Sequence, residues 1–418
     1  MPADGTGAEG ALARFAERWA PGFSGSAGPR YLGFVTGGAT PASVTGDWLT
    51  SAYDQNVSGA AGSWAAALER ETVGRLRELF GLGEAHSGAF VTGAGPCRTR
   101  WELAVAREWP RRAAGRGRVP GRGRRASARS TCSPAARTPA SPRRCPCWAS
   151  AGTGCERCPC SPGTARPSTW PDSTPALAEL GGRPTIVVAN SGTVNTVDFD
   201  DLRAIAALKE RHDFWLHVDA AFGGFAALSP PTPTSSTDST RRTRSASTCT
   251  SGSTCPTTRP SSSPAAATCR PGCSTTPPPT SACRPATRTS STSPRENSRR
   301  LRALPAWFSL LAYGRAGHRE IVERNVALAH RLGEAIAALP GLRLSAPVRL
   351  NVVCFTLADN PTQERVAALA EAVAATGEAF LTPTVYDGTP ALRAAFSNWR
   401  TSEADTDRVL AALGSTPL

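Results

Sequence analysis

Residues 215–224 carry the clearest chemical pattern in this sequence, Trp-Leu-His-Val-Asp-Ala-Ala-Phe-Gly-Gly. Asp219 follows a short apolar run that is typical of a buried strand. A carboxylate at the carboxyl end of a parallel strand lies where α/β proteins bind their ligands. The small residues after Asp219 let a flat ring approach the backbone. We therefore expect a ligand site at Asp219, the alternative being an ordinary turn at the end of a strand.

A second strand end precedes this one in the chain. Residues 185–189 are apolar, and residues 190–195, Asn-Ser-Gly-Thr-Val-Asn, follow them directly. Their small and hydroxyl side chains suit contacts with a cofactor. His217 shares a strand face with Asp219 because side chains alternate along a strand. We interpret His217 as a buried structural histidine and assign it no catalytic role.

The surrounding pattern predicts the elements that position these segments. Apolar residues recur at helical spacing in 64–80 and again in 200–211. The strand 185–189, the helix 200–211 and a strand at 214–218 form a βαβ unit. Downstream we expect a long helix at 318–338, a strand at 351–357, and helices at 362–375 and 402–413. This alternation indicates an α/β protein with a smaller second α/β domain near the C-terminus.

These segments resemble those of the pyridoxal-phosphate-dependent amino-acid decarboxylases of the aromatic-amino-acid and glutamate decarboxylase group. The resemblance includes residues 29–34 and 298–307 as well as the two strand ends. It implies a fold type I large domain with a mainly parallel sheet, pyridoxal 5'-phosphate as cofactor and an amino acid as substrate. It also implies a homodimer in which the N-terminal segment embraces the partner.

The resemblance implies a role for each matching residue. Asp219 would pair with the pyridine nitrogen and keep it protonated, which makes the ring an electron sink. Ala221 would pack against the ring face, and Thr193 would bond near the ring hydroxyl or the substrate carboxylate. Gly93 and Ala94, before an expected helix, would begin the phosphate cradle. No metal is implied.

The lysine that this chemistry requires is missing from the sequence. Related enzymes carry a Schiff-base lysine in a His-Lys motif after the Asp strand, and that interval corresponds to 229–295. Lys209 is the one lysine in the chain, and it falls on the polar side of the helix 200–211. We expect no cofactor role for Lys209, and we expect the chain as written to be inactive.

Three stretches, 95–102, 110–172 and 229–295, differ in composition from the rest. The second has thirteen Arg against two acids, and the third has eight Arg against one. Together the three stretches hold twelve of the 13 cysteines and carry a charge of +19, more than the net +14 of the chain, so the remainder carries −5 and is mildly acidic. Rich in Ser, Thr, Pro, Arg and Cys, they are predicted to be disordered.

A shifted reading frame explains both the composition and the missing lysine. If each codon's third base is joined to the next codon's first two, residues 247–258 permit Asp-Leu-His-Lys-Trp-Leu-Asn-Val-Pro-Tyr-Asp. The lysine would then span the codons of Thr250 and Ser251. The same offset at 137–151 permits a His-Ala-Ser segment like the one in which related enzymes carry a ring-stacking histidine. Sequencing error and a true pseudogene both remain open, and resequencing the gene tests the first.

Two rival functions follow from other features. Aminotransferases and other lyases of the same fold share an Asp and a Gly-rich turn. A basic, Cys-rich chain could instead bind nucleic acid or zinc, because residues 111–129 are Arg- and Gly-rich and Cys155, Cys158 and Cys160 are closely spaced. Against this second rival, stacking aromatic residues are not interleaved with the arginines. We therefore expect no nucleic-acid partner.

The organisation expected from the sequence has three parts. These are an N-terminal segment (1–60), a cofactor-binding large domain (61–300) that contains the three unusual stretches, and a small C-terminal domain (301–418). No apolar run is long enough for a membrane span and no secretory signal is evident, so we expect a cytoplasmic protein. Aromatic, acidic and diamino acids all remain open as substrates.

Overall fold

The computed structural model describes residues 4–57, 62–84, 86–90, 129–132, 177–178, 185–229 and 299–416. The stretch 95–102 lies outside these ranges. So do 110–172 apart from 129–132, and 229–295 apart from its first residue. Gly93, Ala94, Thr250 and Ser251 also lie outside the described residues.

The described residues between 61 and 300 contain a parallel sheet in the order β1-β2-β3. Its strands are β1 (Arg129–Cys132), β2 (Thr185–Asn190) and β3 (Trp215–Asp219), and both pairings are parallel. Helix α6 (Leu202–Leu208) connects β2 to β3 and buries Leu202, Ile205 and Leu208 in a core that includes Val187 of β2. The predicted βαβ unit is thus confirmed. Its helix is shorter than 200–211 because tighter i→i+3 hydrogen bonds form after Leu208.

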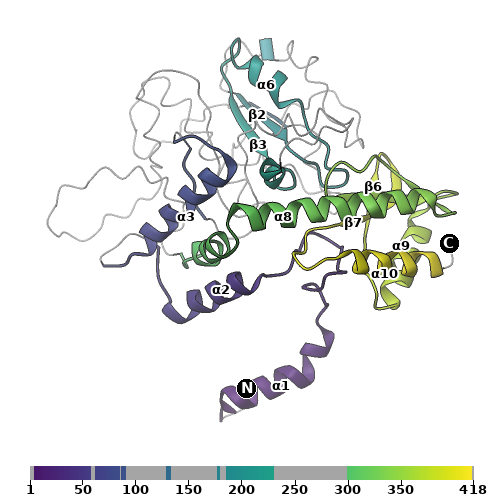
Figure 1. Ribbon diagram of the computed structural model, residues 1–418, viewed down its shortest axis with the longest axis horizontal. Coiled ribbons are helices and arrows are strands. Elements are labelled where there is room, and N and C mark those ends of the chain that lie inside the picture. Colours follow the sequence, from purple (N-terminus) through teal and green to yellow (C-terminus); the bar gives the residue numbers. More distant parts are fainter. Residues whose placement is uncertain are drawn as a thin grey trace.

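Two of the three N-terminal helices pack against the first half of a very long helix. Helices α2 (Pro41–Tyr53) and α3 (Ala65–Phe80) contact the long helix α8 (Ala303–Ala338), whereas α1 (Gly7–Arg18) buries none of its residues. Gly46 of α2 lies so close to α8 that a Cβ there would be 2.7 Å from Pro305 Cα. Beside α3, a buried ion pair joins Arg299 to Glu69 at 2.8 Å. The helices before the unusual stretches, α2 and α3, are therefore held against α8, which follows those stretches (Figure 1).

The helix predicted at 318–338 is confirmed as the second part of α8, but the first part was not predicted. The helix extends back to Ala303 across a kink at Gly314, whose φ of 57° and ψ of −168° are not helical. This break interrupts the helical spacing of apolar residues, which is why the first half was not recognised. The complete α8 runs from α2 and α3 to the C-terminal helices (Figure 1).

The C-terminal part is an antiparallel sheet covered by helices. Val352–Leu357 (β5), Gln363–Ala375 (α9) and Glu403–Ser415 (α10) confirm three predicted elements. Three further strands were not predicted: β4 (Leu342–Leu344), β6 (Thr382–Tyr386) and β7 (Thr389–Ala395). The sheet order is β4-β5-β7-β6. Its apolar face packs on α8, α9 and α10 in one continuous core.

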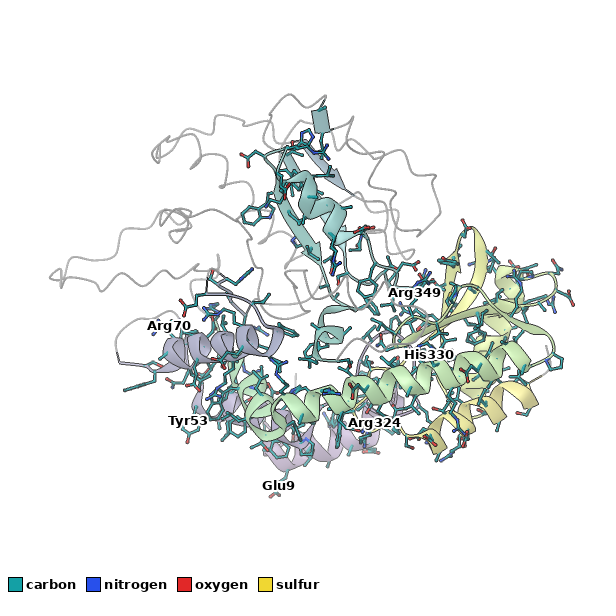
Figure 2. All side chains as sticks on the ribbon, turned by 45° about the horizontal axis from the view of Figure 1, so that its top comes forward. Glu9, Tyr53, Arg70, Arg324, His330 and Arg349 are labelled. Atoms are coloured by element: carbon teal, nitrogen blue, oxygen red, sulfur yellow. The ribbon has the colours of Figure 1, made fainter. Side chains whose placement is uncertain are left out.

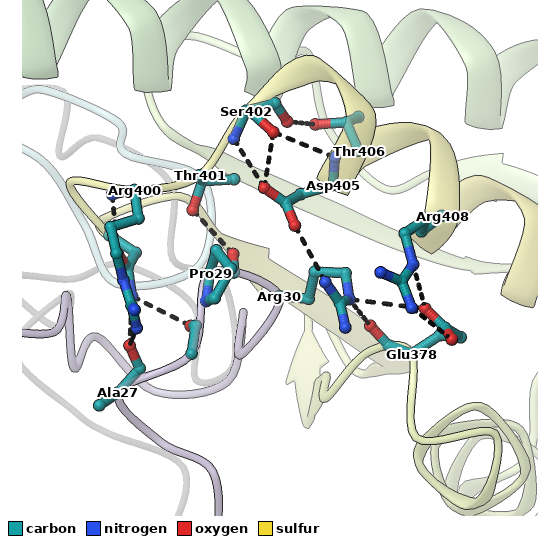
Figure 3. A network of polar contacts seen from close by, with 12 residues as sticks. Ala27, Pro29, Arg30, Glu378, Arg400, Thr401, Ser402, Asp405, Thr406 and Arg408 are labelled. Atoms are coloured by element: carbon teal, nitrogen blue, oxygen red, sulfur yellow. Dashed lines mark hydrogen bonds and ion pairs between the residues drawn. The ribbon is translucent and has the colours of Figure 1, made fainter.

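A polar network attaches the N-terminal segment to this C-terminal part (Figure 3). Arg30 donates to Asp405 Oδ1 at 3.0 Å and to the Glu378 carbonyl at 2.8 Å. Thr401 donates to the Pro29 carbonyl at 2.7 Å. Asp405 also completes the capping box of α10 with Ser402. Residues that are far apart in the sequence thus form one junction below the sheet.

Two shorter features complete the described chain. The 3₁₀ helices η1 (Ala20–Gly22) and η4 (Gly224–Leu228) follow α1 and β3 respectively.

None of the helices in the described ranges is long and apolar enough to span a membrane.

Candidate functional site

The turns after β2 and β3 meet at the carboxyl edge of the parallel sheet. Asn190 is opposite Asp219 in the register, and Ser191 N–H donates to the Asp219 carbonyl at 2.7 Å. Gly223 N–H, in the turn after β3, donates to the Ser191 carbonyl at 2.9 Å. The two predicted segments are therefore brought together, as expected for neighbouring parallel strands.

Two glycines make this close approach sterically allowed. Gly192 has a φ of +100°, and a Cβ there would lie 2.8 Å from Gly223 N. A Cβ on Gly223 would lie 2.4 Å from the Ser191 carbonyl oxygen and 2.7 Å from the Phe199 ring. Any side chain at either position would push the two turns apart, so this edge requires glycine.

Asp219 is half-buried at the end of β3, where the sequence placed it. Its Oδ1 accepts a hydrogen bond from Ala221 N–H at 3.1 Å, which orients the carboxylate toward the turn. Ala221 itself is exposed. The hydroxyl of Ser191 is fully buried nearby and has no hydrogen-bond partner among the described residues. This edge thus combines an oriented carboxylate with an unsatisfied hydroxyl.

Thr193 lies in the same turn, but its hydroxyl is engaged within it. Thr193 Oγ1 accepts from Asp198 N–H at 3.0 Å and lies 3.2 Å from Thr196 Oγ1. Because Thr196 donates to Asp198 Oδ2 at 2.6 Å, the Thr193 proton is directed to Thr196. One lone pair of Thr193 Oγ1 is then left for another donor.

An ion pair beside this turn, between a buried carboxylate and a partly exposed guanidinium, was not predicted from the sequence. Asp198 is 2% exposed, and its Oδ1 lies 2.8 Å from the Arg349 guanidinium. Figure 2 shows Arg349 where the C-terminal sheet faces the parallel sheet. Burial raises the pKa of Asp198, although the hydrogen bond from Thr196 and the charge of Arg349 oppose that change. Neither residue has a sequence signal, because their separation along the chain hides the pairing.

A cavity of about 410 Å³ opens beside this pair. Burial, together with the charge of Asp198, raises the pKa of Tyr386 at its wall. The hairpin that carries Tyr386 had a sequence signal that was overlooked, the Asp-Gly pair at 387–388. Both residues have the positive φ of a two-residue hairpin turn.

Lys209 lies at the opposite edge of the sheet. It is the C-cap of α6, and its Nζ is 5.8 Å from the centre of the Phe214 ring. Phe214 directly precedes β3, whereas Asp219 ends that strand, about 16 Å further along at 3.3 Å per residue. The single lysine of the chain is thus remote from the candidate site.

Comparison with known proteins shows local similarity to decarboxylases. The chain is 53% identical over 55 residues to cysteine sulfinic acid decarboxylase of Rattus norvegicus, but the aligned part is only 13% of this chain and 11% of that protein. Phenylacetaldehyde synthase of Petunia hybrida is 25% identical over 227 residues, which are 50% of this chain and 45% of that protein. These curated relatives are matched over less than half of their length.

The fold is similar to solved structures over nearly the whole chain. Tryptophan decarboxylase of Catharanthus roseus in complex with L-tryptophan gives a TM-score of 0.74 at 16% identity, covering 99% of this chain and 89% of the other. Mouse CSAD gives a TM-score of 0.74 at 21% identity with the same coverage. Residues 15–254, more than half of the chain, match the family model described as the pyridoxal-dependent decarboxylase conserved domain. The chain therefore belongs to the family of pyridoxal-dependent decarboxylases.

Proposed function

We propose that the chain is the scaffold of a pyridoxal-phosphate-dependent amino-acid decarboxylase, with the cofactor site at the carboxyl edge of β2 and β3. The oriented carboxylate of Asp219 at that edge is the observation that carries this proposal. Pyridoxal phosphate supplies an electron sink for the carbanion that remains when carbon dioxide leaves an amino acid. The family match supports decarboxylation over amino transfer, and it supports an enzyme over a nucleic-acid- or zinc-binding protein.

The residues at this edge fit the ring of the cofactor. Asp219 would accept a hydrogen bond from the protonated pyridine nitrogen, and the exposed Ala221 would pack against one ring face. The free lone pair of Thr193 would meet a polar group of the cofactor or of the substrate. Gly93 and Ala94, outside the described residues, remain our prediction for the phosphate cradle.

The chain does not fit covalent attachment of the cofactor. Its one lysine lies at the wrong edge of the sheet. We therefore propose that the chain as written binds pyridoxal phosphate without a covalent bond and does not turn over an amino acid. The shifted frame would restore a lysine at Thr250 and Ser251, within the proposed large domain 61–300.

We also propose that a second copy of the chain is the partner. Helix α1 buries none of its residues and projects away from the body of the molecule (Figure 1). Its amphipathic surface and the turn after it expose large apolar side chains: Leu12, Phe15, Trp19 and Phe23. A segment like this needs a surface to cover it. We assign it, with the rest of segment 1–60, to a homodimer contact, separate from the small domain 301–418.

A cofactor titration tests the function. We expect the purified chain to bind pyridoxal phosphate reversibly, to quench tryptophan fluorescence and to retain no cofactor after borohydride reduction and dialysis. Asp219→Asn should weaken binding at least tenfold, because the neutral amide no longer favours a protonated pyridine. Asp213→Asn, an exposed control just before β3, should bind like the unmodified chain. Failure of the unmodified chain to bind, or equal affinity of Asp219→Asn, would refute this site.

Sedimentation velocity tests the partner. We expect the unmodified chain to sediment as a dimer and a chain with Trp19→Ser and Phe23→Ser to shift toward monomer. Leu311→Ser, which removes an exposed apolar side chain from α8, is the control. An unmodified monomer would contradict the proposed contact.

A further inference from the structure

Asp198 organises the turn that follows β2. It is buried, and its main chain closes the turn on Thr193. The Asp198 carbonyl accepts from Thr193 N–H at 3.0 Å, and Asp198 N–H donates to Thr193 Oγ1 at 3.0 Å. Its carboxylate is directed elsewhere, to Thr196 at 2.6 Å and to the Arg349 guanidinium at 2.8 Å. The main chain of Asp198 therefore fixes the backbone of the turn, which leaves the carboxylate a separate task.

That task concerns the hydroxyl groups that converge on Thr196. Thr196 Oγ1 lies 2.6 Å from Asp198 Oδ2 and 3.2 Å from Thr193 Oγ1, and it also bonds the hydroxyl of Tyr386. A hydroxyl oxygen carries one proton and two lone pairs, whereas a carboxylate can only accept. Thr196 therefore gives its proton to Asp198, and its two lone pairs accept from Thr193 and Tyr386. Burial and the charge of Asp198 raise the pKa of Tyr386, which keeps the proton that it donates.

The consequence for Thr193 is that its hydroxyl can only accept from a ligand. A free hydroxyl turns either its proton toward an acceptor or a lone pair toward a donor. Thr193 has lost that choice, because its proton is committed to Thr196 and one lone pair to Asp198 N–H. A carboxylate cannot bond the lone pair that remains. Of the two partners expected for Thr193, the ring hydroxyl therefore fits and the substrate carboxylate does not.

Arg349 keeps this direction from reversing. A protonated Asp198 could donate to Thr196, which would turn both threonine hydroxyls round. The guanidinium that lies 2.8 Å from Asp198 Oδ1 favours the ionised carboxyl, which cannot donate. Because Arg349 precedes β5, the C-terminal part of the chain helps to decide how a hydroxyl beside the parallel sheet is oriented.

We propose that Asp198 is a positioning residue that fixes the direction of the Thr193 hydroxyl through Thr196, so that this position of the site receives a hydrogen-bond donor. This inference rests on the proposed function. The donor that fits is the ring hydroxyl of pyridoxal phosphate in its protonated form. Asp198 acts on it only through the two threonine hydroxyls.

Asp198→Asn reverses the chain of hydroxyls without changing the size of the side chain. Arg349 requires an acceptor, so it retains the amide oxygen and leaves the amide NH₂ facing Thr196. Thr196 then accepts from that NH₂ and turns its own proton to Thr193. The Thr193 proton is released into the site, which now presents a donor in place of a lone pair.

The backbone of the turn should not move in this variant. Arg393 of β7 donates from Nη1 to the Val194 carbonyl at 3.1 Å, and Thr384 of β6 donates to Asn195 Oδ1 at 3.0 Å. Neither bond involves Asp198. The variant therefore separates the direction of the hydroxyls from the position of the turn.

Hydroxyl exchange measures the reversal without any ligand. In the full-length chain with isotope-labelled threonine, the isotope shift of Thr193 Cβ in mixed water and deuterium oxide reports how fast the hydroxyl proton exchanges. We expect exchange about tenfold faster in Asp198→Asn, because the proton loses its bond to Thr196. Amide exchange of Gly192, Thr193 and Val197 should stay slow, since these N–H groups bond to main-chain carbonyls inside the turn.

The absorption of a bound ring measures the consequence for the ligand. Deoxypyridoxine phosphate has the ring hydroxyl and the phosphate group but no aldehyde, so its absorption reports the ionisation of the ring. The unmodified chain should bind it with the hydroxyl protonated, whereas Asp198→Asn should favour the ionised form, which absorbs at longer wavelength. Thr196→Ser is the matched control, because it keeps the hydroxyl of the chain and should behave like the unmodified protein in both measurements.

Two exchange results would overturn the proposal. One is a Thr193 hydroxyl that exchanges equally slowly in Asp198→Asn. The other is amide exchange that speeds up together with the hydroxyl, because Asp198 would then only hold the turn in place. An ionised ring hydroxyl in the unmodified chain overturns it as well, since the site would then receive an acceptor.

Failure of the proposed function has a different signature. In that case the unmodified chain binds neither pyridoxal phosphate nor deoxypyridoxine phosphate. The hydroxyl exchange of Asp198→Asn still decides whether Asp198 directs Thr193, because that measurement needs no ligand.

Discussion

The C-terminal sheet and the parallel sheet are stabilised in different ways. The C-terminal core draws all its buried members from residues 328–413, with Leu32 as the one addition. The turn that ends β2 in the parallel sheet is instead held by Thr384 and Arg393 of the other sheet and by Arg349, which precedes β5. The three stretches of unusual composition all fall within 61–300, the proposed cofactor-binding domain that contains the parallel sheet.

The difference follows from how each kind of sheet is connected. Antiparallel neighbours can be joined by a two-residue turn, as β6 and β7 are at Asp387 and Gly388. Parallel neighbours need a crossover of a dozen residues or more, so distant sequence must be correct before the strands pair. The parallel sheet is therefore more sensitive than the antiparallel sheet to changes in the chain between its strands.

The largest expected effect is on the buried ion pair of the cofactor side. Glu69→Gln leaves the Arg299 charge buried without its partner, so the free energy of unfolding should fall by roughly 3–5 kcal/mol. Urea denaturation measures the loss. Hydrogen exchange should show intact protection in β5 and β7, which would sharpen the contrast between the two regions.

Glu71→Gln is the control for that variant. Glu71 is on the same helix but its carboxylate bonds Arg75 and Trp307 on the surface, so little change is expected. Equal losses in the two variants, or lost protection in β5 and β7, would contradict the separation of the regions.

A smaller effect is expected where the two strand-end turns meet. Gly223→Ala places a Cβ 2.4 Å from the Ser191 carbonyl oxygen, so stability should fall by about 2 kcal/mol and cofactor affinity should be lost. Thermal unfolding and a pyridoxal phosphate titration measure these changes.

Gly74→Ala provides the comparison, because a Cβ there meets no atom within 4 Å and the position is inside α3. It should raise stability by up to about 1 kcal/mol and leave the cofactor site unchanged. Cofactor affinity that survives in Gly223→Ala would show that the turns need not touch.

The smallest expected effect is a pH dependence on the C-terminal side. Burial opposes ionisation of Asp405, but hydrogen bonds from Ser402 and the charge of Arg30 outweigh it and lower the pKa of this carboxyl. Because the folded pKa lies below the unfolded value of about 3.9, the stabilisation is present above that value. It is lost as pH falls through the folded pKa.

Urea unfolding between pH 6 and pH 2.5 measures this contribution. Asp405→Asn should cost about 1 kcal/mol at pH 6 and little at pH 2.5, so the two curves converge in acid. Asp407→Asn, two residues further along α10 and 55% exposed at its side chain, should follow the unmodified chain at every pH. Parallel curves for Asp405→Asn and the unmodified chain would refute the assignment.

Much of the fold could be predicted because its signals are local. The apolar run of β2, the amphipathic helix α6 and the apolar run of β3 were each visible in a short window, and together they placed Asp219 at a strand end. The first half of α8 was missed because Gly314 breaks the spacing. The β6–β7 hairpin was missed although its Asp-Gly turn is a recognised signal.

The residues of the candidate site also divide into those with a local sequence signal and those that only packing reveals. The strand-end pattern singled out Asp219 as a candidate, and the family resemblance added Ala221 and Thr193 as predictions. The sequence pattern could not single out Arg393, because an arginine within a strand looks like any solvent-facing charge. Only packing shows that this guanidinium is buried and bonded to two distant carbonyls.

By itself, the sequence determined the family resemblance, the βαβ unit and the absence of a lysine at the cofactor edge, because these depend on residue identity and local spacing. The tertiary structure alone decided which distant segments hold the Thr193 turn. Asp198 meets Arg349, and Arg393 meets Val194 and Phe34, only after two sheets with separate connections have packed together. Contacts between residues so far apart in the sequence leave no periodic pattern in it. Only the folded structure therefore reveals them.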